Sequence, residues 1–499
     1  MSATDHLAIR IAANDDVAVA LRDLAAGDRV PVGAALITLT TAIPRGHKFA
    51  VRELSIGEPI RKYGAPIGRA TAAIRSGDHV HSHNVATNLT GLDAYDFQPS
   101  SARAQPNAEP DRTFLGYRRT NGRVGTRNEI WILCTVGCVG RTAERIARIG
   151  GQRFAGRVDG VHAFAHQFGC SQLGGDLDRT RSLIASLASH PNAGGVLILG
   201  LGCESNQLEQ LLAEIPQEQR SHIRAFSAQA TSDETEEGLR VLEELVALAE
   251  RTQREPCPLS ALTIGVKCGG SDGFSGMTAN PLVGRMTDRV TAAGGTSILT
   301  EIPEIFGAEH VLMERAANAE VFEQIGAVVN DFKAYFIRNE QPVSENPSPG
   351  NIAGGITTLE EKSLGAVQKG GHAIVTEVLR YGAQARSHGL VLLEAPGNDG
   401  VSSTALVAAG ATLLLFTTGR GTPLGFPAPT LKISSNSALA ANKPHWIDFD
   451  AGRALATDDP QPLEDELLDL IVATASGQRA RNELNEEREI AIWKDGVTL

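Results

Sequence analysis

Several marks of secreted, membrane-spanning and nucleic-acid-binding proteins are absent from this sequence. No apolar run approaches the roughly 18 residues that a membrane-spanning helix needs. The N-terminal segment MSATDHLAIRIAANDD has no basic region followed by an apolar core, so we expect no signal peptide. The net charge is −12 and no long basic block occurs, which argues against nucleic acid as the main partner. We therefore expect a cytoplasmic protein without a membrane or nucleic-acid partner.

Cysteine is also scarce, because the 499 residues contain only six, and their spacing is not that of a secreted disulfide framework. We expect these thiols to be free or functional. Glycine, in contrast, is abundant: 52 of the 499 residues are glycine, above the usual level of about 7%. This abundance suits a loop-rich enzyme, and a chain of this length is expected to form about two to four domains.

Residues 1–97 are expected to form a small β-rich domain, because short alternating apolar segments are separated by Gly and Pro turns. One helical piece is expected at 16–26. The domain closes with the segment GDHVHSHN, in which His79, His81 and His83 would share one face of an extended strand. Three imidazoles in a row suit a divalent metal or an anionic substrate, and the alternative is a solvated polar strand edge.

The rest of the chain is expected to be an α/β body in two parts. A connector rich in Pro, Ser and Ala spans 98–112, after which residues 113–255 and 256–499 alternate apolar strand patterns with helical ones. Such alternation implies Rossmann-like, largely parallel sheets flanked by helices. No G-x-G-x-x-G opens a helix after a strand, so nicotinamide binding has little support.

Residues with reactive side chains gather where the predicted strands end. Thiols follow four strand ends, with a histidine or an acid beside two of them; these residues are Cys134, Cys138, His166, Cys170, Cys203, Glu204 and Cys268. Because ligands bind outside the carboxyl ends of the strands in such sheets, we interpret them as candidate functional groups. Buried structural cysteines are the alternative.

Two glycine-rich turns are further candidates. The segment CGGSDG ends an apolar strand, and its glycines allow backbone N–H groups to approach a ligand. Its candidate residues are Gly269, Gly270, Ser271 and Asp272. The segment TTGRG is a second compact turn and carries Arg420. The alternative for the first turn is a tight turn with a structural cysteine.

Two other segments are rich in donors or acids. GYRRTNGRVGTRN suits carboxylates and hydroxyls, unless it is a charged surface loop; its candidates are Arg118, Arg123, Arg127 and Asn128. TEIPEIFGAEH could bind a metal or move protons, unless it is the first turn of a helix; its candidates are Glu301, Glu304, Glu309 and His310.

Together, these segments resemble the altronate and galactarate dehydratases. IPRGHKFAVREL, GEPIRKYGAPIGRAT and GDHVHSHN are similar to the SAF-type β-clip domain that opens those enzymes. GYRRTNGRVGTRN, KCGGSDGFSGMTANP and FTTGRGTPLGFPAPTLKISSN are similar to their main body. The resemblance runs in order through nearly the whole chain. It implies an iron(II)-dependent hydro-lyase, with Mn²⁺ as another possible metal, that converts a sugar acid of the altronate or galactarate type to a 2-keto-3-deoxy acid.

We hypothesise the following roles. The metal is held where the N-terminal domain meets the body, and its ligands are His81, His83, Cys268 and Glu304. The small-molecule substrate is gripped by Arg118, Arg123, Arg127, Asn128, Gly269, Gly270, Ser271 and Arg420. His166 is the preferred general base or acid, Asp272 is the next candidate, and Cys170 completes the catalytic set. We also expect a homo-oligomer.

Several alternatives stay open. The cysteines could hold an iron–sulfur cluster, as in aconitase-type hydro-lyases. A related lyase could eliminate sulfite from sulfolactate, although here the clip domain and the body are fused, as in the sugar-acid enzymes. The substrate could be a shorter aldonic acid. A non-catalytic sugar-acid binding protein is disfavoured by the many His, Cys and acidic residues at strand ends.

Overall fold

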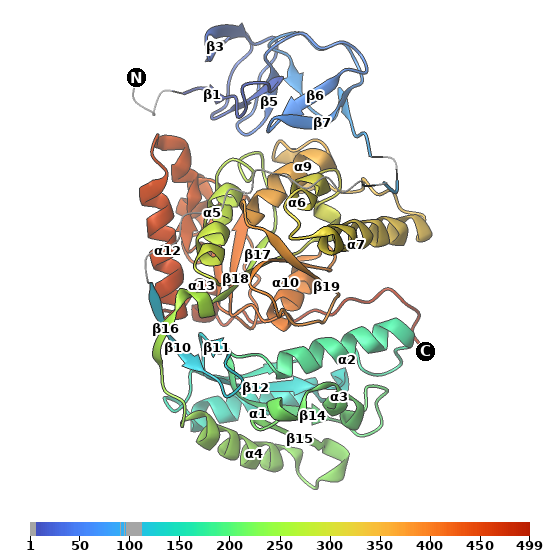
Figure 1. Ribbon diagram of the computed structural model, residues 1–499, viewed down its shortest axis with the longest axis vertical. Coiled ribbons are helices and arrows are strands. Elements are labelled where there is room, and N and C mark those ends of the chain that lie inside the picture. Colours follow the sequence, from blue (N-terminus) through green and yellow to red (C-terminus); the bar gives the residue numbers. More distant parts are fainter. Residues whose placement is uncertain (1–5, 90, 94, 96–111) are drawn as a thin grey trace.

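The computed structural model describes residues 6–89, 91–93, 95 and 112–499, so the expected connector 98–112 lies outside them except for Arg112. Figure 1 shows three parts along the longest axis. The N-terminal domain lies at one end, the C-terminal domain in the centre, and the middle domain, named for its place in the sequence, at the other end. A small antiparallel β domain followed by an α/β body with parallel sheets confirms the predicted fold class.

The N-terminal domain contains three small antiparallel sheets, with strand orders β1-β2-β5-β8, β3-β4 and β6-β7-β9. Its strands are β1 (Ala8–Ile9), β2 (Val17–Ala20), β3 (Arg29–Val32), β4 (Ala35–Thr38), β5 (Lys48–Ala50), β6 (Pro59–Lys62), β7 (Ala65–Ala70), β8 (His79–Val80) and β9 (Val85–Ala86). The predicted helical piece at 16–26 is wrong, because its apolar part is strand β2. All four β2 residues are buried and the strand pairs with β5, so packing overrides the helix preference of alanine.

The middle domain is built on a four-stranded parallel sheet of order β13-β12-β14-β15. Its strands are β12 (Glu129–Cys134), β13 (Val161–Phe164), β14 (Ala193–Gly200) and β15 (Ile223–Ser227), and its helices are α1 (Gly140–Arg153), α2 (Gly174–Ala188), α3 (Leu208–Glu214) and α4 (Glu234–Ala249). Every residue of β12 and β14 is buried, as expected for parallel strands covered by helices on both faces.

The C-terminal domain is built on a seven-stranded parallel sheet of order β19-β20-β18-β17-β21-β22-β23. Its strands are β17 (Thr263–Cys268), β18 (Thr296–Leu299), β19 (Val375–Leu379), β20 (Gly389–Leu393), β21 (Leu413–Thr418), β22 (Thr430–Ser434) and β23 (Phe449–Asp450). Its helices are α5 (Ala279–Ala292), α6 (Glu309–Met313), α7 (Ala319–Arg338), α8 (Pro349–Ala353), α9 (Leu359–Ala366), α10 (Asp399–Ala408), α11 (Ser437–Asn442), α12 (Gln461–Ala475) and α13 (Arg481–Leu484). Strand β17 is central, which places the predicted CGGSDG turn at the middle of the carboxyl edge of the sheet.

The middle and C-terminal domains are joined at several points. A small sheet of order β11-β10-β16 joins them by pairing β10 of the middle domain with β16 of the C-terminal domain. Its strands are β10 (Thr113–Arg118), β11 (Val124–Gly125) and β16 (Glu255–Pro258). One hydrophobic core includes Leu183 and Leu187 of α2 with Leu406 of α10. The last residues of the chain also contact the middle domain, because the N–H groups of Asp495 and Gly496 donate to Asp176. In the part of the chain that the structure describes, no helix is both long and apolar enough to cross a membrane.

Candidate active site

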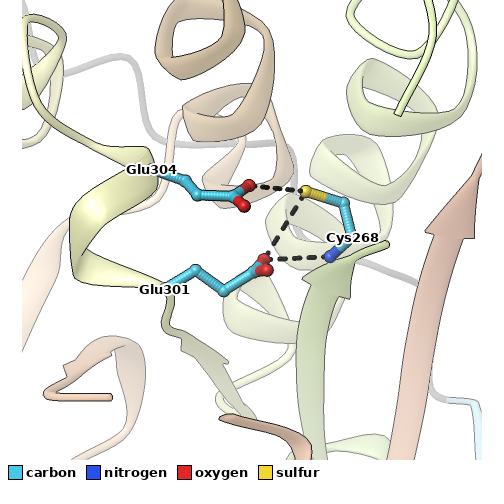
Figure 2. A group of neighbouring side chains, drawn as sticks. All are labelled: Cys268, Glu301 and Glu304. Carbon is cyan, nitrogen blue, oxygen red and sulfur yellow. Dashed lines mark hydrogen bonds between the residues drawn. The ribbon is translucent and has the colours of Figure 1, made fainter. Parts of the chain in front are cut away.

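A buried group of one thiol and two carboxylates lies at the carboxyl end of β17 (Figure 2). Cys268 is the last residue of β17, Glu301 follows β18, and Glu304 ends the 3₁₀ helix Ile302–Glu304. The Cys268 sulfur lies 3.5 Å from Glu301 Oε2 and 3.4 Å from Glu304 Oε2, and the Cys268 N–H donates to Glu301 Oε2 at 2.9 Å. One potential ligand atom from each residue lies within 4.8 Å of the others, so this group could hold a metal ion.

Lys267 connects this group to helix α10. Its Nζ donates to Glu301 Oε1 at 2.9 Å and to Asp399 Oδ1 at 2.7 Å. Burial alone would lower the pKa of Lys267, but Glu301 and Asp399 raise it overall. Burial alone would raise the pKa of Glu301, but Lys267 and Lys369 lower it to about 2. Both members of this buried pair are therefore charged at neutral pH.

Two further lysines complete the cluster. Lys369 Nζ donates to Cys268 Sγ at 2.9 Å, and Lys362 Nζ donates to Glu304 Oε1 at 2.7 Å. Burial, reinforced by Glu301, raises the pKa of the Cys268 thiol to about 12, so the thiol is protonated at neutral pH. Burial alone would lower the pKa of Lys369, but Cys268 and Glu301 raise it overall. The lysine–carboxylate cluster is defined as Lys267, Lys362, Lys369, Glu301, Glu304 and Asp399, with Cys268 at its centre.

Charge balance limits how a metal could enter this cluster. Its three lysines already match its three carboxylates, and the Cys268 thiol is neutral. A cation therefore has to displace a lysine ammonium or the thiol proton, which makes metal binding pH-dependent.

A pocket of about 500 Å³ opens onto the cluster. This volume is within the usual range for small-ligand sites, and the position outside the carboxyl ends of parallel strands is the expected one. The lining residues are Cys268, Gly269, Gly270, Ser271, Glu304, Asn346, Ser348, Asn351, Lys362, Gly397, Asn398, Asp399, Gly400 and Leu424. The structure thus brings the predicted Gly269, Gly270 and Ser271 together with Cys268 and Glu304.

Two predicted residues lie beside this pocket. Arg420 is exposed, lies next to Gly270, and donates through Nη1 to the Gly350 carbonyl at 3.1 Å. Asp272 Oδ1 accepts from the hydroxyl groups of Ser275 and Ser435 at 2.9 and 2.8 Å. The Asp272 carboxylate therefore anchors its own loop, and its acid–base role stays a prediction.

The predicted arginine segment lies at the joint between the middle and C-terminal domains rather than in the pocket. Arg127 is buried and donates twice to Glu483 at 2.8 Å. Its neighbours are also engaged within the protein: Arg118 with Glu255, Arg123 with Gln384, and Asn128 with the Ala249 carbonyl. The structure thus places the predicted substrate ligands Arg118, Arg123, Arg127 and Asn128 away from this pocket, and their role in substrate binding stays a prediction.

His166 and Cys170 lie at the carboxyl edge of the other sheet. His166 is buried, its Nε2 lies 2.8 Å from the Cys134 carbonyl, and its Nδ1 lies 3.1 Å from the Phe168 N–H. Both ring nitrogens therefore hold the loop together, and the acid–base role of His166 stays a prediction. Cys170 is exposed.

The predicted histidines form a separate cluster. The rings of His79, His81 and His83 gather with that of His47, which the sequence analysis missed, at centroid distances of 4.9 to 5.7 Å. His47 Nδ1 lies 3.1 Å from His79 Nε2, and His81 Nε2 lies 3.1 Å from the Ile352 carbonyl of the C-terminal domain. Burial and the neighbouring His81 lower the pKa of His79 to about 4, so it is neutral at neutral pH. The proposed metal ligands are therefore divided between this histidine cluster and the Cys268 group.

Sequence reasoning also missed Lys267 and Asp399. A lysine inside an apolar strand, as in TIGVKC, was the available signal for Lys267, because a buried lysine needs a charged partner. No comparable signal marks Asp399, since a first-turn acid is common in helices. A pocket that combines buried cations, carboxylates and backbone donors is typical of an acid–base enzyme.

Comparisons with known proteins agree with this conclusion. Residues 6–88 match the altronate/galactarate dehydratase SAF domain, 116–250 the D-galactarate dehydratase/altronate hydrolase second domain, and 259–498 the D-galactarate/altronate dehydratase C-terminal domain. The altronate dehydratases of Escherichia coli (strain K12) and Bacillus subtilis (strain 168) are 50% and 48% identical, each over 98% of this chain and 99% of the relative. Galactarate dehydratase (L-threo-forming) of E. coli is 34% identical over 94% of this chain and 93% of the relative. The chain belongs to the altronate/galactarate dehydratase family.

Proposed function

We propose that this protein is a sugar-acid hydro-lyase that acts on altronate and releases a 2-keto-3-deoxy acid. The observation that supports this proposal is the pocket over the lysine–carboxylate cluster. It lies in a chain that is about half identical, over nearly its whole length, to proteins named altronate dehydratase.

The cluster suits the chemistry of dehydration. A proton leaves the carbon next to the substrate carboxylate, and the hydroxyl of the following carbon takes up a proton and leaves as water. The enol that remains converts to the 2-keto-3-deoxy acid. Lys362 and Arg420 bind the carboxylate and stabilise the negative charge that develops on it. Asp399 accepts the proton, because Lys267 holds its Oδ1 while its carboxylate lines the pocket. Residue 269 must be glycine here, since a Cβ would lie 2.6 Å from Asp399 Oδ2.

Divalent iron fits two sets of residues, with Mn²⁺ as the other possible metal. His81 and His83, with His47 and His79, offer a cluster of imidazoles, which are good ligands for iron. Cys268 and Glu304, with Glu301, offer a thiol and carboxylates, but their lysine partners compete for them. When bound, the metal would act as a Lewis acid toward substrate oxygens. The histidines have no ammonium groups that compete for them, whereas the ligand atoms of the Cys268 group already lie within 4.8 Å of one another.

The first experiment is an anaerobic assay of the purified protein with ferrous iron. The panel contains altronate, galactarate, a shorter aldonic acid and sulfolactate. We expect a 2-keto-3-deoxy product from altronate, lost on chelation. Turnover of only the shorter acid, or release of sulfite from sulfolactate, would replace this proposal, and binding without turnover would indicate a non-catalytic protein.

Variants separate the roles of the side chains. We expect Asp399→Asn and Lys362→Met to lower kcat at least about 100-fold, the usual range for a general base or a charge-stabilising donor. Asp331→Asn, at an exposed ion pair on α7, is the control and should retain activity. Iron content then assigns the metal, since His81→Ala should lose it and Cys268→Ser should keep it.

The assembly and location of the protein are part of the same proposal. We expect a cytoplasmic homo-oligomer. Light scattering on the purified protein tests the first expectation, and cell fractionation tests the second.

A further inference from the structure

The carboxyl edge of the middle-domain sheet exposes three thiols. Free cysteine is among the most buried residue types, and the other three cysteines of the chain are buried as expected. The three exposed cysteines are Cys138, Cys170 and Cys203. Each directly follows a glycine and lies in the loop after β12, β13 or β14.

The loops that carry these thiols are bonded to one another. The Gly137 N–H donates to the Phe168 carbonyl at 2.9 Å, which ties the Cys138 loop to the Cys170 loop. The Asn206 N–H donates to the Gly169 carbonyl at 2.9 Å, which ties the Cys170 loop to the Cys203 loop. Strands β13, β12 and β14 are adjacent, so the three loops meet at one place.

At the glycines of these loops, the neighbouring backbone lies too close to leave room for a side chain. A Cβ on Gly169 would lie 2.0 Å from the Thr135 carbonyl oxygen, and one on Gly137 would lie 2.8 Å from the His166 carbonyl oxygen. Gly169 and Gly202 have φ of +99° and +130°, which disfavour side chains. Below these loops Glu204 accepts from the Thr135 hydroxyl at 2.5 Å, and His166 bonds two loop backbones. The thiols are therefore held on a rigid base.

We propose that Cys138, Cys170 and Cys203 hold an iron–sulfur cluster, at a site distinct from the Cys268 group and from the histidine cluster. Three thiolates hold three irons of a four-iron cluster and leave one iron without a protein ligand. This proposal goes beyond the proposed dehydratase activity and does not depend on which sugar acid is the substrate.

As they lie, the three thiols are not gathered closely enough to share a single ion. Among the described residues, the three-residue group whose ligand atoms all lie within 4.8 Å is the one around Cys268, and these three thiols do not form such a group. An iron–sulfur cluster holds its thiolates farther apart than one ion does, because each thiolate binds a different iron. Cys138 also precedes the N-terminus of α1, where the helix dipole suits a net-negative cluster.

The test measures iron and acid-labile sulfide in the full-length protein after anaerobic reconstitution with ferrous iron and sulfide. We expect about four sulfides and, beyond the mononuclear iron proposed above, about four irons per chain, with broad visible absorption that air bleaches. Cys138→Ser, Cys170→Ser and Cys203→Ser should each lose most of the sulfide. Cys257→Ala, at a buried cysteine, should keep it. Sulfide distinguishes this site from the mononuclear iron proposed above.

A second measurement needs no variant. Alkylation of the loaded wild-type protein, read by mass spectrometry, should spare Cys138, Cys170 and Cys203, and removal of the cluster should make all three reactive. Absence of sulfide from the reconstituted protein would overturn the proposal. So would a single metal ion on these thiols, or equal alkylation with and without iron and sulfide.

Discussion

The two parallel sheets place different chemistry at their carboxyl edges. At the C-terminal edge, Lys267 and Glu301 are each 1% exposed and pair with each other. At the middle edge, the buried carboxylate of Glu204 has neutral partners, since it accepts from the Thr135 hydroxyl and from the N–H groups of Leu201 and Gly202. The carboxyl edge of a parallel sheet thus buries ion pairs in one domain and exposes thiols in the other.

This difference shows two ways to keep a carboxylate charged without water. Neutral donors satisfy Glu204 and leave no other charge in the site. Ammonium groups satisfy the C-terminal cluster and leave cations beside the pocket, where they can act on an anionic substrate. The predictions below test whether the buried charges set the C-terminal domain apart.

The largest effect is expected from Lys267→Met. Loss of this ammonium leaves the buried Glu301 carboxylate without its main cation, as well as the Asp399 carboxylate, whose side chain is 35% exposed. Breaking a buried ion pair in this way costs about 3–5 kcal/mol of unfolding free energy. Urea unfolding measures this loss of unfolding free energy, and enzymatic activity should be lost as well. A loss below about 1 kcal/mol would mean that water solvates the cluster more than its burial indicates. The buried charges would then not distinguish the C-terminal sheet edge from the middle-domain sheet edge.

The sequence predicted the parallel sheets well because their signal is local. Strand β14, for example, is a continuous apolar run bounded by glycine and polar residues, and it forms where the pattern predicts. The strand β2 was misjudged because Val-Ala-Val-Ala fits a helix as well as a strand over so short a length. Only its pairing with β5 decides between them.

The candidate site was predicted in part, and the arginine segment shows one limit of sequence reasoning. Gly269, Gly270 and Ser271 line the pocket because the turn itself builds that surface. Arg127 looked like a substrate ligand, but its partner Glu483 lies 356 residues away in the sequence. Spacing along the chain cannot reveal such a partner, so a donor-rich segment gives no sign that its donors are already used.

The second-largest effect is expected when the pH is lowered from 7 to 5, which should reduce the stability of the middle domain. Burial, with the nearby Arg123, lowers the pKa of His190 to about 3, against about 6.5 when unfolded. The unfolded chain then binds more protons, so the stability from this group is complete above about pH 6.5 and is lost as the pH falls toward 3. About 2 kcal/mol should be lost between pH 7 and pH 5. Glu301, with its pKa near 2, stays ionised over that interval.

Trp131 provides the readout, because its ring stacks on His190 at 5.0 Å. In a protein with Trp131 as its only tryptophan, the urea midpoint should fall between pH 7 and pH 5. In the matched protein that keeps only Trp446 of the C-terminal domain, it should move less. Equal shifts would show that the domains unfold together and that acid does not distinguish them.

The smallest effect is expected from Arg240→Ala on the outer face of α4. Arg240 bridges Glu237, at 2.7 Å, and Glu244, so it has the same arrangement as Lys267: one cation between two carboxylates. It differs in lying in water, where the carboxylates are already solvated and salt screens the pair. The urea midpoint should therefore match that of the wild type within error. A clear decrease, comparable to that of Lys267→Met, would mean that the bridge geometry, and not its burial, sets the energy of these ion pairs.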